Sequence, residues 1–165
     1  MQVTLRAANV EDARQIAAVL VASRRAFLPF APLRHSDDQV EHWVRSALIP
    51  TGAVTVALVA DAIVGVLAVS TKDEVLWLDQ LYIYPTHVGQ GIGSTLLAVA
   101  LATNPACVRL YTFQENHRAR RFYERHGFVA IALSDGSTNE ERCPDVLYEL
   151  ARSAVGDQTS KVSPE

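Results

Sequence analysis

The pattern of apolar and polar positions predicts an alternation of helices and strands along the chain. Apolar residues recur at the i, i+3, i+4 spacing of an amphipathic helix over residues 10–25. The second helix is expected over residues 37–48, because Pro50 cannot continue it. Two polar pairs resemble capping boxes, which start helices: Asn9 with Asp12, and Ser36 with Gln39.

From residue 54 onward the chain becomes rich in valine, in nearly continuous apolar runs typical of strands buried on both faces. These runs predict strands over residues 54–60, 63–70 and 75–83. Shorter strands are expected at 3–7, 108–112, 128–133 and 146–150, and further helices at 91–103 and 116–126. The order predicts an α/β fold with a largely antiparallel first half and strand-helix-strand crossovers later.

Composition and charge narrow the class of protein. A length of 165 residues with 49 % hydrophobic residues suits one globular domain, expected over residues 1–150, with a polar tail over residues 151–165. The net charge of −3 gives no support for nucleic-acid binding. The longest apolar runs have seven residues, too few to cross a membrane, and the start lacks a signal-peptide pattern, so a cytoplasmic location is expected.

The sequence has no pattern typical of a metal site or of a disulfide framework. Cys107 and Cys143 form no CxxC pair and are interpreted as ordinary small residues. The five histidines have no metal-like spacing, so no metal is assigned.

Residues 89–93, Gly-Gln-Gly-Ile-Gly, follow a buried strand and open a helix. Glycines let the backbone approach a ligand, and free N–H groups at a helix N-terminus attract phosphate. The loop is neither a P-loop, since no lysine precedes Ser94, nor a dinucleotide fingerprint, since the third glycine is missing. A glycine-rich turn without a ligand is the alternative.

Residues 81–93 with Leu96 and Leu97 resemble the acyl-CoA pyrophosphate motif of the GNAT acetyltransferase superfamily. Asn116 and residues 119–128 resemble its second motif, in the expected order and spacing, so the resemblance covers about residues 3–150. It implies a GNAT-like mixed, mostly antiparallel central sheet of about seven strands flanked by about four helices, with acetyl-CoA as cosubstrate. Val88 departs from the Arg or Gln usual in the family, so backbone N–H groups are expected to make most phosphate contacts. The cofactor-binding residues that the resemblance implies are Leu81, Tyr82, Ile83, Val88, Gly89, Gln90, Gly91, Ile92, Gly93, Ser94, Asn116, Arg120 and Tyr123.

The resemblance implies transfer of an acetyl group to an amine, with Tyr123 as general acid; a core tyrosine is the alternative. Asp79 is a candidate base or substrate-orienting residue, because a carboxylate buried in an apolar strand is costly without a partner or a function. Strand periodicity would place it on the same face as Trp77 and Leu81. A structural, hydrogen-bonded role is the alternative. Glu140 and Glu141 are other candidates for the base.

The acceptor site is expected between the loop around His35 and the polar excursion at residues 135–145. The excursion holds four acidic residues and one arginine, and is either an acidic lip for a cationic amine or a solvated loop. The predicted substrate-binding residues are His35, Trp43, Asp79, Glu140 and Glu141. The sequence therefore predicts a cytoplasmic N-acetyltransferase that acts on a primary amine of a small molecule or peptide in a ternary complex. The alternative is a non-catalytic acyl-CoA-binding sensor, and a homodimer stays open.

Overall fold

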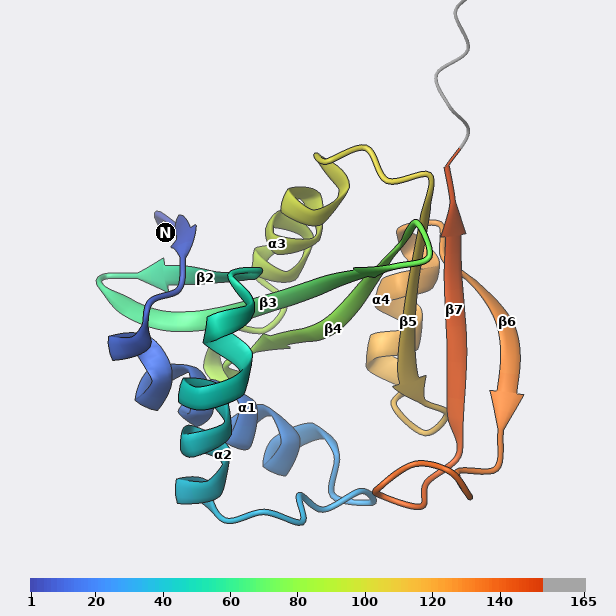
Figure 1. Ribbon diagram of the computed structural model, residues 1–165, viewed down its shortest axis with the longest axis horizontal. Helices are drawn as coiled ribbons and strands as arrows, with labels where there is room; N and C mark the ends of the chain where they lie inside the picture. The colour runs from blue at the N-terminus through green and yellow to red at the C-terminus, as the bar shows by residue number, and fades with distance from the viewer. Residues whose placement is uncertain (153–165) are drawn as a thin grey trace, which may run out of the picture.

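The computed structural model describes residues 1–152, in which seven strands form one open sheet (Figure 1). Their order in the sheet is β1-β2-β3-β4-β5-β7-β6, and every neighbouring pair is antiparallel except the parallel pair β4–β5. The mixed, mostly antiparallel sheet predicted from the sequence is confirmed. The strands are β1 Thr4–Ala7, β2 Val54–Val59, β3 Ala62–Lys72, β4 Val75–Ile83, β5 Cys107–Phe113, β6 Val129–Ser134 and β7 Asp145–Ala151. The tail was predicted over residues 151–165, and its residues 153–165 lie outside the described residues.

Within residues 1–152, four α-helices flank the sheet: α1 Ala13–Phe27, α2 Asp37–Trp43, α3 Ile92–Leu101 and α4 His117–Arg125. Both predicted capping boxes are present, one before the short 3₁₀ turn that leads into α1 and one at the start of α2. The second helix is shorter than predicted, because it continues as a π-helical turn over Val44–Leu48 and a 3₁₀ turn over Ile49–Thr51. In the π-helical turn the Ser46 hydroxyl donates to the His42 carbonyl, a side-chain bond that competes with the regular ladder.

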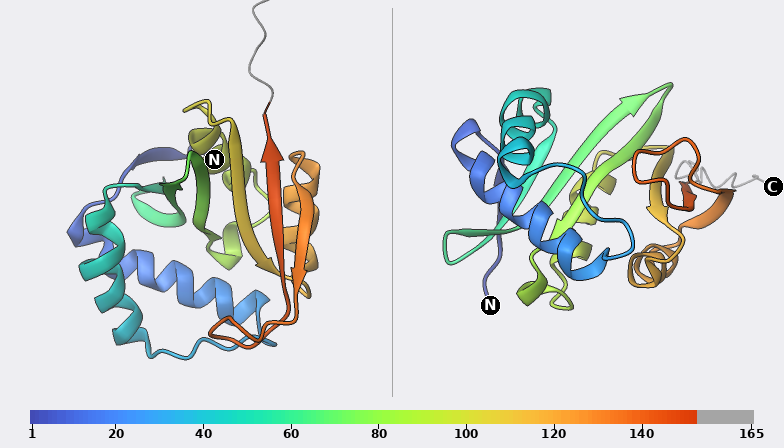
Figure 2. Two further views of the ribbon diagram at one scale, coloured as in Figure 1. Left: turned by 45° about the vertical axis from the view of Figure 1, so that its right-hand side comes forward. Right: turned by 90° about the horizontal axis from the view of Figure 1, so that it is seen from below.

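The helices cover the two faces of the sheet in separate groups (Figure 2). Helices α1 and α2 bury their apolar faces against β2 and β3 on one side. Helices α3 and α4 pack on the other side, over a core that extends from β2 to β7 and contains Tyr123 and Tyr148. Helix α3 approaches β3 closely at Gly65, where an added Cβ would lie 3.0 Å from Leu96 Cδ1 and 3.1 Å from Ile92 Cγ2.

A β-bulge in β4 changes which residues face each core. Leu78 pairs with Val69 and Gln80 with Ala68, so Asp79 is an extra residue without a partner in β3. Leu76 and Leu78 before the bulge, and Leu81 after it, therefore all face the core under α3 and α4. The predicted placement of Asp79 on one face with both Trp77 and Leu81 is wrong, because the sequence pattern assumed an unbroken alternation.

Strands β4 and β5 are joined only near their starts. The described register pairs Leu76 with Val108 and Trp77 with Arg109, and β4 then continues to Ile83 without a partner in β5. The divergence of these two strands is visible below the centre of the sheet in Figure 1. It leaves the second half of β4 accessible between α1, α3 and α4.

No α-helix within residues 1–152 is both long enough and apolar enough to cross a membrane. In the same part of the chain, no group of three or more His, Cys, Asp or Glu side chains could hold a metal ion.

Candidate active site

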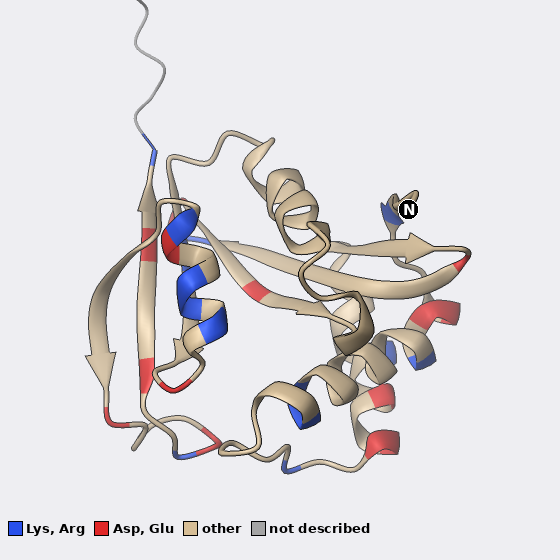
Figure 3. Cartoon of the chain, turned by 180° about the vertical axis from the view of Figure 1, so that it is seen from behind, with Lys and Arg blue, Asp and Glu red and all other residues tan. Residues whose placement is uncertain are grey.

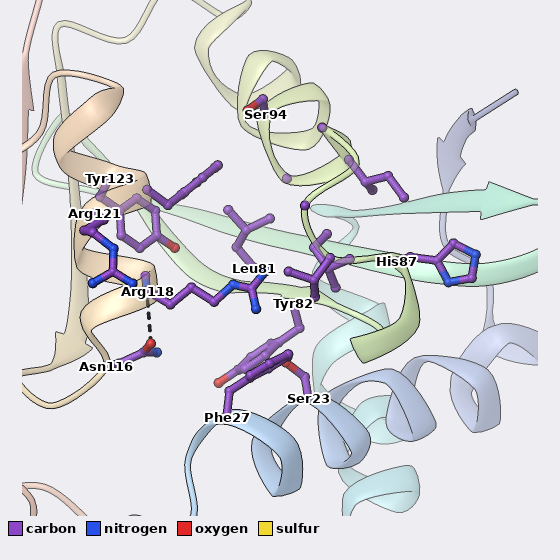
Figure 4. A pocket seen from close by; sticks show the side chains of 18 of the residues that line it. Ser23, Phe27, Leu81, Tyr82, His87, Ser94, Asn116, Arg118, Arg121 and Tyr123 are labelled. Atoms are coloured by element: carbon purple, nitrogen blue, oxygen red, sulfur yellow. Dashed lines mark hydrogen bonds between the residues drawn. The ribbon is translucent and has the colours of Figure 1, made fainter. Parts of the chain in front are cut away.

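A cavity of about 600 Å³ opens where β4 leaves β5, with walls from α1, the loop after β4, α3 and α4 (Figure 4). Most of the residues that the sequence assigns to a cofactor meet here. Two do not line the cavity: Gln90, whose amide is turned to the Thr86 carbonyl, and Arg120. The predicted residues in the lining are Leu81, Tyr82, Ile83, Val88, Gly89, Gly91, Ile92, Gly93, Ser94, Asn116 and Tyr123.

The start of α3 gives one end of the cavity the features of an anion site. Gly91 is the N-cap with φ 83° and Gly89 has φ 79°, left-handed conformations that a residue with a Cβ adopts only at a cost. No atom lies within 4 Å of a Cβ placed at either glycine, so conformation and not space requires glycine here. The first N–H groups of α3 have no partner within the helix and are available to a phosphate.

The cavity lining is strongly cationic, although the whole chain carries a net charge of −3. Arg118, Arg121 and Arg125 of α4 line it together with His87, and no carboxylate belongs to the lining among the described residues. The basic positions along α4 are blue on the ribbon in Figure 3. We missed these three arginines in the sequence, although their i, i+3, i+7 spacing places them on one side of a helix.

Arg120, the adjacent arginine that the sequence did assign to the cofactor, is engaged inside the fold. Its Nε donates to the Tyr148 hydroxyl at 3.0 Å and its Nη1 to the Gln114 carbonyl at 3.1 Å. Tyr148 in turn donates to Glu124 at 2.8 Å. The guanidinium thus joins α4 to β7 and is turned away from the cavity.

His126 links the two helices at the phosphate end. Its Nδ1 lies 2.8 Å from the Phe122 carbonyl, which can only accept, so Nδ1 carries the proton in the neutral ring. Nε2 is then the acceptor for the Ser94 hydroxyl at 3.1 Å. Ser94 lines the cavity from the first turn of α3, so this bond fixes α3 against the end of α4.

Tyr123 is a core residue and a cavity residue at once. It is only 8 % exposed and packs with its ring against Phe122, Phe128 and Tyr148. Burial, with a smaller contribution from Tyr82, raises the pKa of the Tyr123 hydroxyl well above its ordinary value. The hydroxyl is therefore protonated at neutral pH, as a proton donor must be. Asn116, the N-cap of α4, accepts from the Ala119 N–H at 3.2 Å and also faces the cavity.

Asp79 lies on the surface. We expected a buried carboxylate, but its side chain is exposed because the bulge takes it out of the regular pleat. It is not part of the cavity lining. The cost of burial, on which its predicted importance rested, therefore does not apply.

The two loops predicted to form the acceptor site do meet. His35 Nε2 lies 2.6 Å from Glu140, and Arg24 of α1 donates to Glu141 at 3.1 Å. Asp145 accepts from Ser134 at 2.6 Å and from Asn139 at 3.1 Å. These carboxylates are bound to partners within the chain, so the excursion is a cross-linked loop and not a row of free acidic groups. None of the five predicted substrate-binding residues lines the cavity, and Trp43 is 40 % exposed on α2.

Helix α1 contributes a wall of the cavity that we did not predict. Ser23, Phe27 and Leu28 line it, and the guanidinium carbon of Arg118 lies 4.9 Å from the centre of the Phe27 ring. This cation–π contact crosses from α4 to α1. No signal in the sequence could have revealed it, because the two residues come from elements far apart in the chain.

The chain matches the model of the acetyltransferase (GNAT) family over residues 17–128. No curated protein matches it. Among solved structures, the PaiA N-acetyltransferase of Thermoplasma acidophilum in complex with coenzyme A is 20 % identical, with a TM-score of 0.72, over 92 % of this chain and 100 % of that one. Naa50 of Arabidopsis thaliana, in complex with a bisubstrate analogue, is 20 % identical, with a TM-score of 0.69 and the same coverage. The ribosomal-protein-S18-alanine N-acetyltransferase of Escherichia coli is 18 % identical, with a TM-score of 0.67, over 95 % and 98 % of the two chains. At these identities the structures are alike in fold.

Proposed function

Because the chain belongs to the GNAT acetyltransferase family, we propose that it transfers the acetyl group of acetyl-CoA to a primary amine of a small molecule or peptide. The observation that carries the proposal is the cavity itself. A glycine loop at a helix N-terminus and three arginines, without a carboxylate in the described lining, face a buried tyrosine. This combination suits a ligand that carries several phosphates at one end and a reacting group at the other.

Different residues along the cavity bind different parts of acetyl-CoA. Backbone N–H groups of residues 88–94 hold the diphosphate, assisted by Arg121 and Arg125. Leu81, Ile83 and Phe122 provide an apolar path for the pantetheine arm along the free half of β4, and Asn116 contacts its amides. The thioester then lies beside the Tyr123 hydroxyl.

The reaction joins the amine nitrogen to the acetyl carbon and breaks the bond between that carbon and sulfur. The amine loses a proton, and the departing thiolate takes one from Tyr123, so the products are an acetamide and free coenzyme A. Because burial raises the pKa of Tyr123, its hydroxyl carries a proton when the thioester binds.

We propose Asp79 as the group that accepts the amine proton or orients the amine, acting from the exposed bulge of β4 outside the described cavity lining. Glu140 and Glu141 suit that role less well. Each is already engaged with a basic side chain, Glu140 with His35 and Glu141 with Arg24.

Release of free thiol from acetyl-CoA with a panel of primary amines tests the proposal, with acetyl-CoA binding measured by calorimetry on the same protein. We expect binding together with amine-dependent thiol release. Binding without release from any amine would favour the alternative, a non-catalytic acyl-CoA sensor. The absence of binding would contradict both.

A further inference from the structure

The cavity has two ends, and α4 spans the distance between them. The end of α4 is fixed to the start of α3 by the bond between His126 and Ser94, beside the phosphate loop. Near its beginning, Arg118 is fixed against Phe27 of α1. Arg121 and Arg125 follow Arg118 by one and two turns toward the phosphate end. Arg118 is therefore the arginine farthest along α4 from the phosphate loop.

Arg118 has a positive charge without a counter-charge. Its guanidinium makes no ion pair or side-chain hydrogen bond with any residue in the described part of the chain, and its contact is with the face of Phe27. Figure 4 shows its side chain extending into the cavity above Phe27, near Tyr82. A guanidinium that lies over an aromatic ring, without a hydrogen-bonded partner, still has N–H groups free to donate. The paired N–H groups of a guanidinium match the geometry of a carboxylate.

Three of the four carboxylates in the loop at residues 135–145 have partners other than Arg118: Glu141 is bound to Arg24, Glu140 to His35, and Asp145 to Ser134 and Asn139. The fourth, Asp135, accepts from the N–H of Ser137 within the loop itself. The described lining of the cavity thus offers a cation and no anion to an acceptor that enters near α1. A multiply cationic amine would be repelled there, and an acceptor with an anionic group would be attracted.

We propose that Arg118 determines acceptor specificity by binding a carboxylate, so that the acceptor is an amine that also carries a carboxylate, as an amino acid does. This inference rests on the proposed acetyl transfer. It replaces the cationic acceptor expected from the acidic composition of residues 135–145.

The test compares amino acids with their carboxamides, which differ in the carboxylate alone, as acceptors for thiol release from acetyl-CoA. The panel contains glycine, β-alanine and γ-aminobutyrate, each with its amide, so that the distance from amine to carboxylate is varied. We expect at least one acid to exceed its amide by roughly tenfold or more in kcat/KM, the usual gain from a charge-assisted bond. The amides have the less basic amines, so a preference for acids cannot come from amine protonation.

The variant Arg118→Gln should remove this preference by raising KM for the acid, and Arg118→Lys should restore part of it. The matched control is Arg125→Gln, which should raise KM for acetyl-CoA equally with both members of a pair. Equal turnover of acids and amides by the unmodified protein would overturn the proposal and leave acetyl transfer standing. If Arg118→Gln instead lowered the affinity for acetyl-CoA and reduced turnover of the acid and its amide equally, Arg118 would be assigned to cofactor binding, and the proposal would be overturned. No thiol release from any amine would overturn the proposed function and this inference together.

Discussion

The Ser94 hydroxyl lies 3.1 Å from Nε2 of His126, which fixes the first turn of α3 against the last residues of α4. These two helices carry the backbone and side-chain groups of the phosphate end. A bond between them holds both walls at a constant separation before a ligand arrives. Pre-organisation of this kind lowers the entropy that binding must offset.

Replacement of either partner should therefore weaken acetyl-CoA binding in a coupled way. We expect Ser94→Ala and His126→Ala each to lower affinity by roughly two- to tenfold, the size of one hydrogen bond. The double variant should lose less binding free energy for acetyl-CoA than the sum of the two single losses, because the second change has no bond left to break. Calorimetric titration of the four proteins measures the coupling, and strictly additive losses would show that the bond has no part in binding.

Tyr123→Phe should preserve the fold and lower kcat. The ring contacts with Phe122, Phe128 and Tyr148 do not require the hydroxyl, whereas the leaving thiolate does. Loss of a general acid typically costs about 10²–10⁴-fold in rate. Steady-state thiol release and a melting curve measure both effects, and unchanged turnover by a folded variant would remove the assignment of the acid.

The direction of the pKa shift adds a pH test of the same residue. Because burial raises the pKa of Tyr123, its proton remains in place throughout the range from neutral pH to pH 9. Activity of the unmodified protein should show no loss from tyrosine ionisation in that range. A fall in kcat between pH 7 and pH 9 that Tyr123→Phe abolishes would contradict the structural environment.

The sequence was sufficient to predict the element order and the phosphate loop, because both depend on local patterns of valine, glycine and capping residues. The sequence could not predict the bulge at Asp79, because a bulge is defined by the register between β3 and β4 and not by the residue itself. The carboxylates of the loop at residues 135–145 were counted correctly, but their partners come from elements as distant as α1. Composition gives the number of charges and leaves their pairing open.

The adjacent residues Arg120 and Arg121 have the same charge but different partners, which the sequence did not reveal. Arg120 and Arg121 differ by one position, or about 100° around α4, and only Arg121 lines the cavity. Arg120→Ala should destabilise the fold by about 1–3 kcal/mol, because the Tyr148 hydroxyl and the Gln114 carbonyl lose a charged donor. Acetyl-CoA affinity should be unchanged. Arg121→Ala is the matched control, with the opposite pattern of lower affinity and unchanged stability.

Gly65 and Gly91 should respond to alanine for different reasons. At Gly65 the new methyl group meets Leu96, Ile92 and Ile83 at 3.0–3.1 Å, so Gly65→Ala should cost about 1–3 kcal/mol through overpacking of α3 on β3. At Gly91 there is free space but a left-handed backbone, so Gly91→Ala should cost about 1 kcal/mol. Only Gly91→Ala should also weaken acetyl-CoA binding, since it disturbs the N-terminus of α3 directly. Chemical denaturation and calorimetry separate the two, and equal losses of affinity would contradict this division.

Asp12 should make the fold sensitive to acid. Its carboxylate accepts from both terminal nitrogens of Arg6, at 2.7 and 2.9 Å, and from the Asn9 N–H at 2.8 Å. These bonds, first the one to Arg6, lower the pKa of Asp12 below its ordinary value. The stabilisation is therefore complete above the pKa of the unfolded chain, near 4, and is lost as the pH falls through the lower pKa of the folded state.

Asp12→Asn should accordingly lower the free energy of unfolding by about 1–2 kcal/mol at pH 7, a modest figure because Arg6 is 40 % exposed and its charge is screened. The difference between the two proteins should shrink as the pH falls below about 4, because the unmodified carboxylate then takes up a proton. Urea denaturation at pH 7 and at several pH values below 4 measures the gap. Glu11→Gln, an exposed change of the same kind one position away, is the control and should leave the pH dependence unaltered. If the difference in free energy of unfolding stayed constant below pH 4, Asp12 would stabilise the turn by its shape and not by its charge.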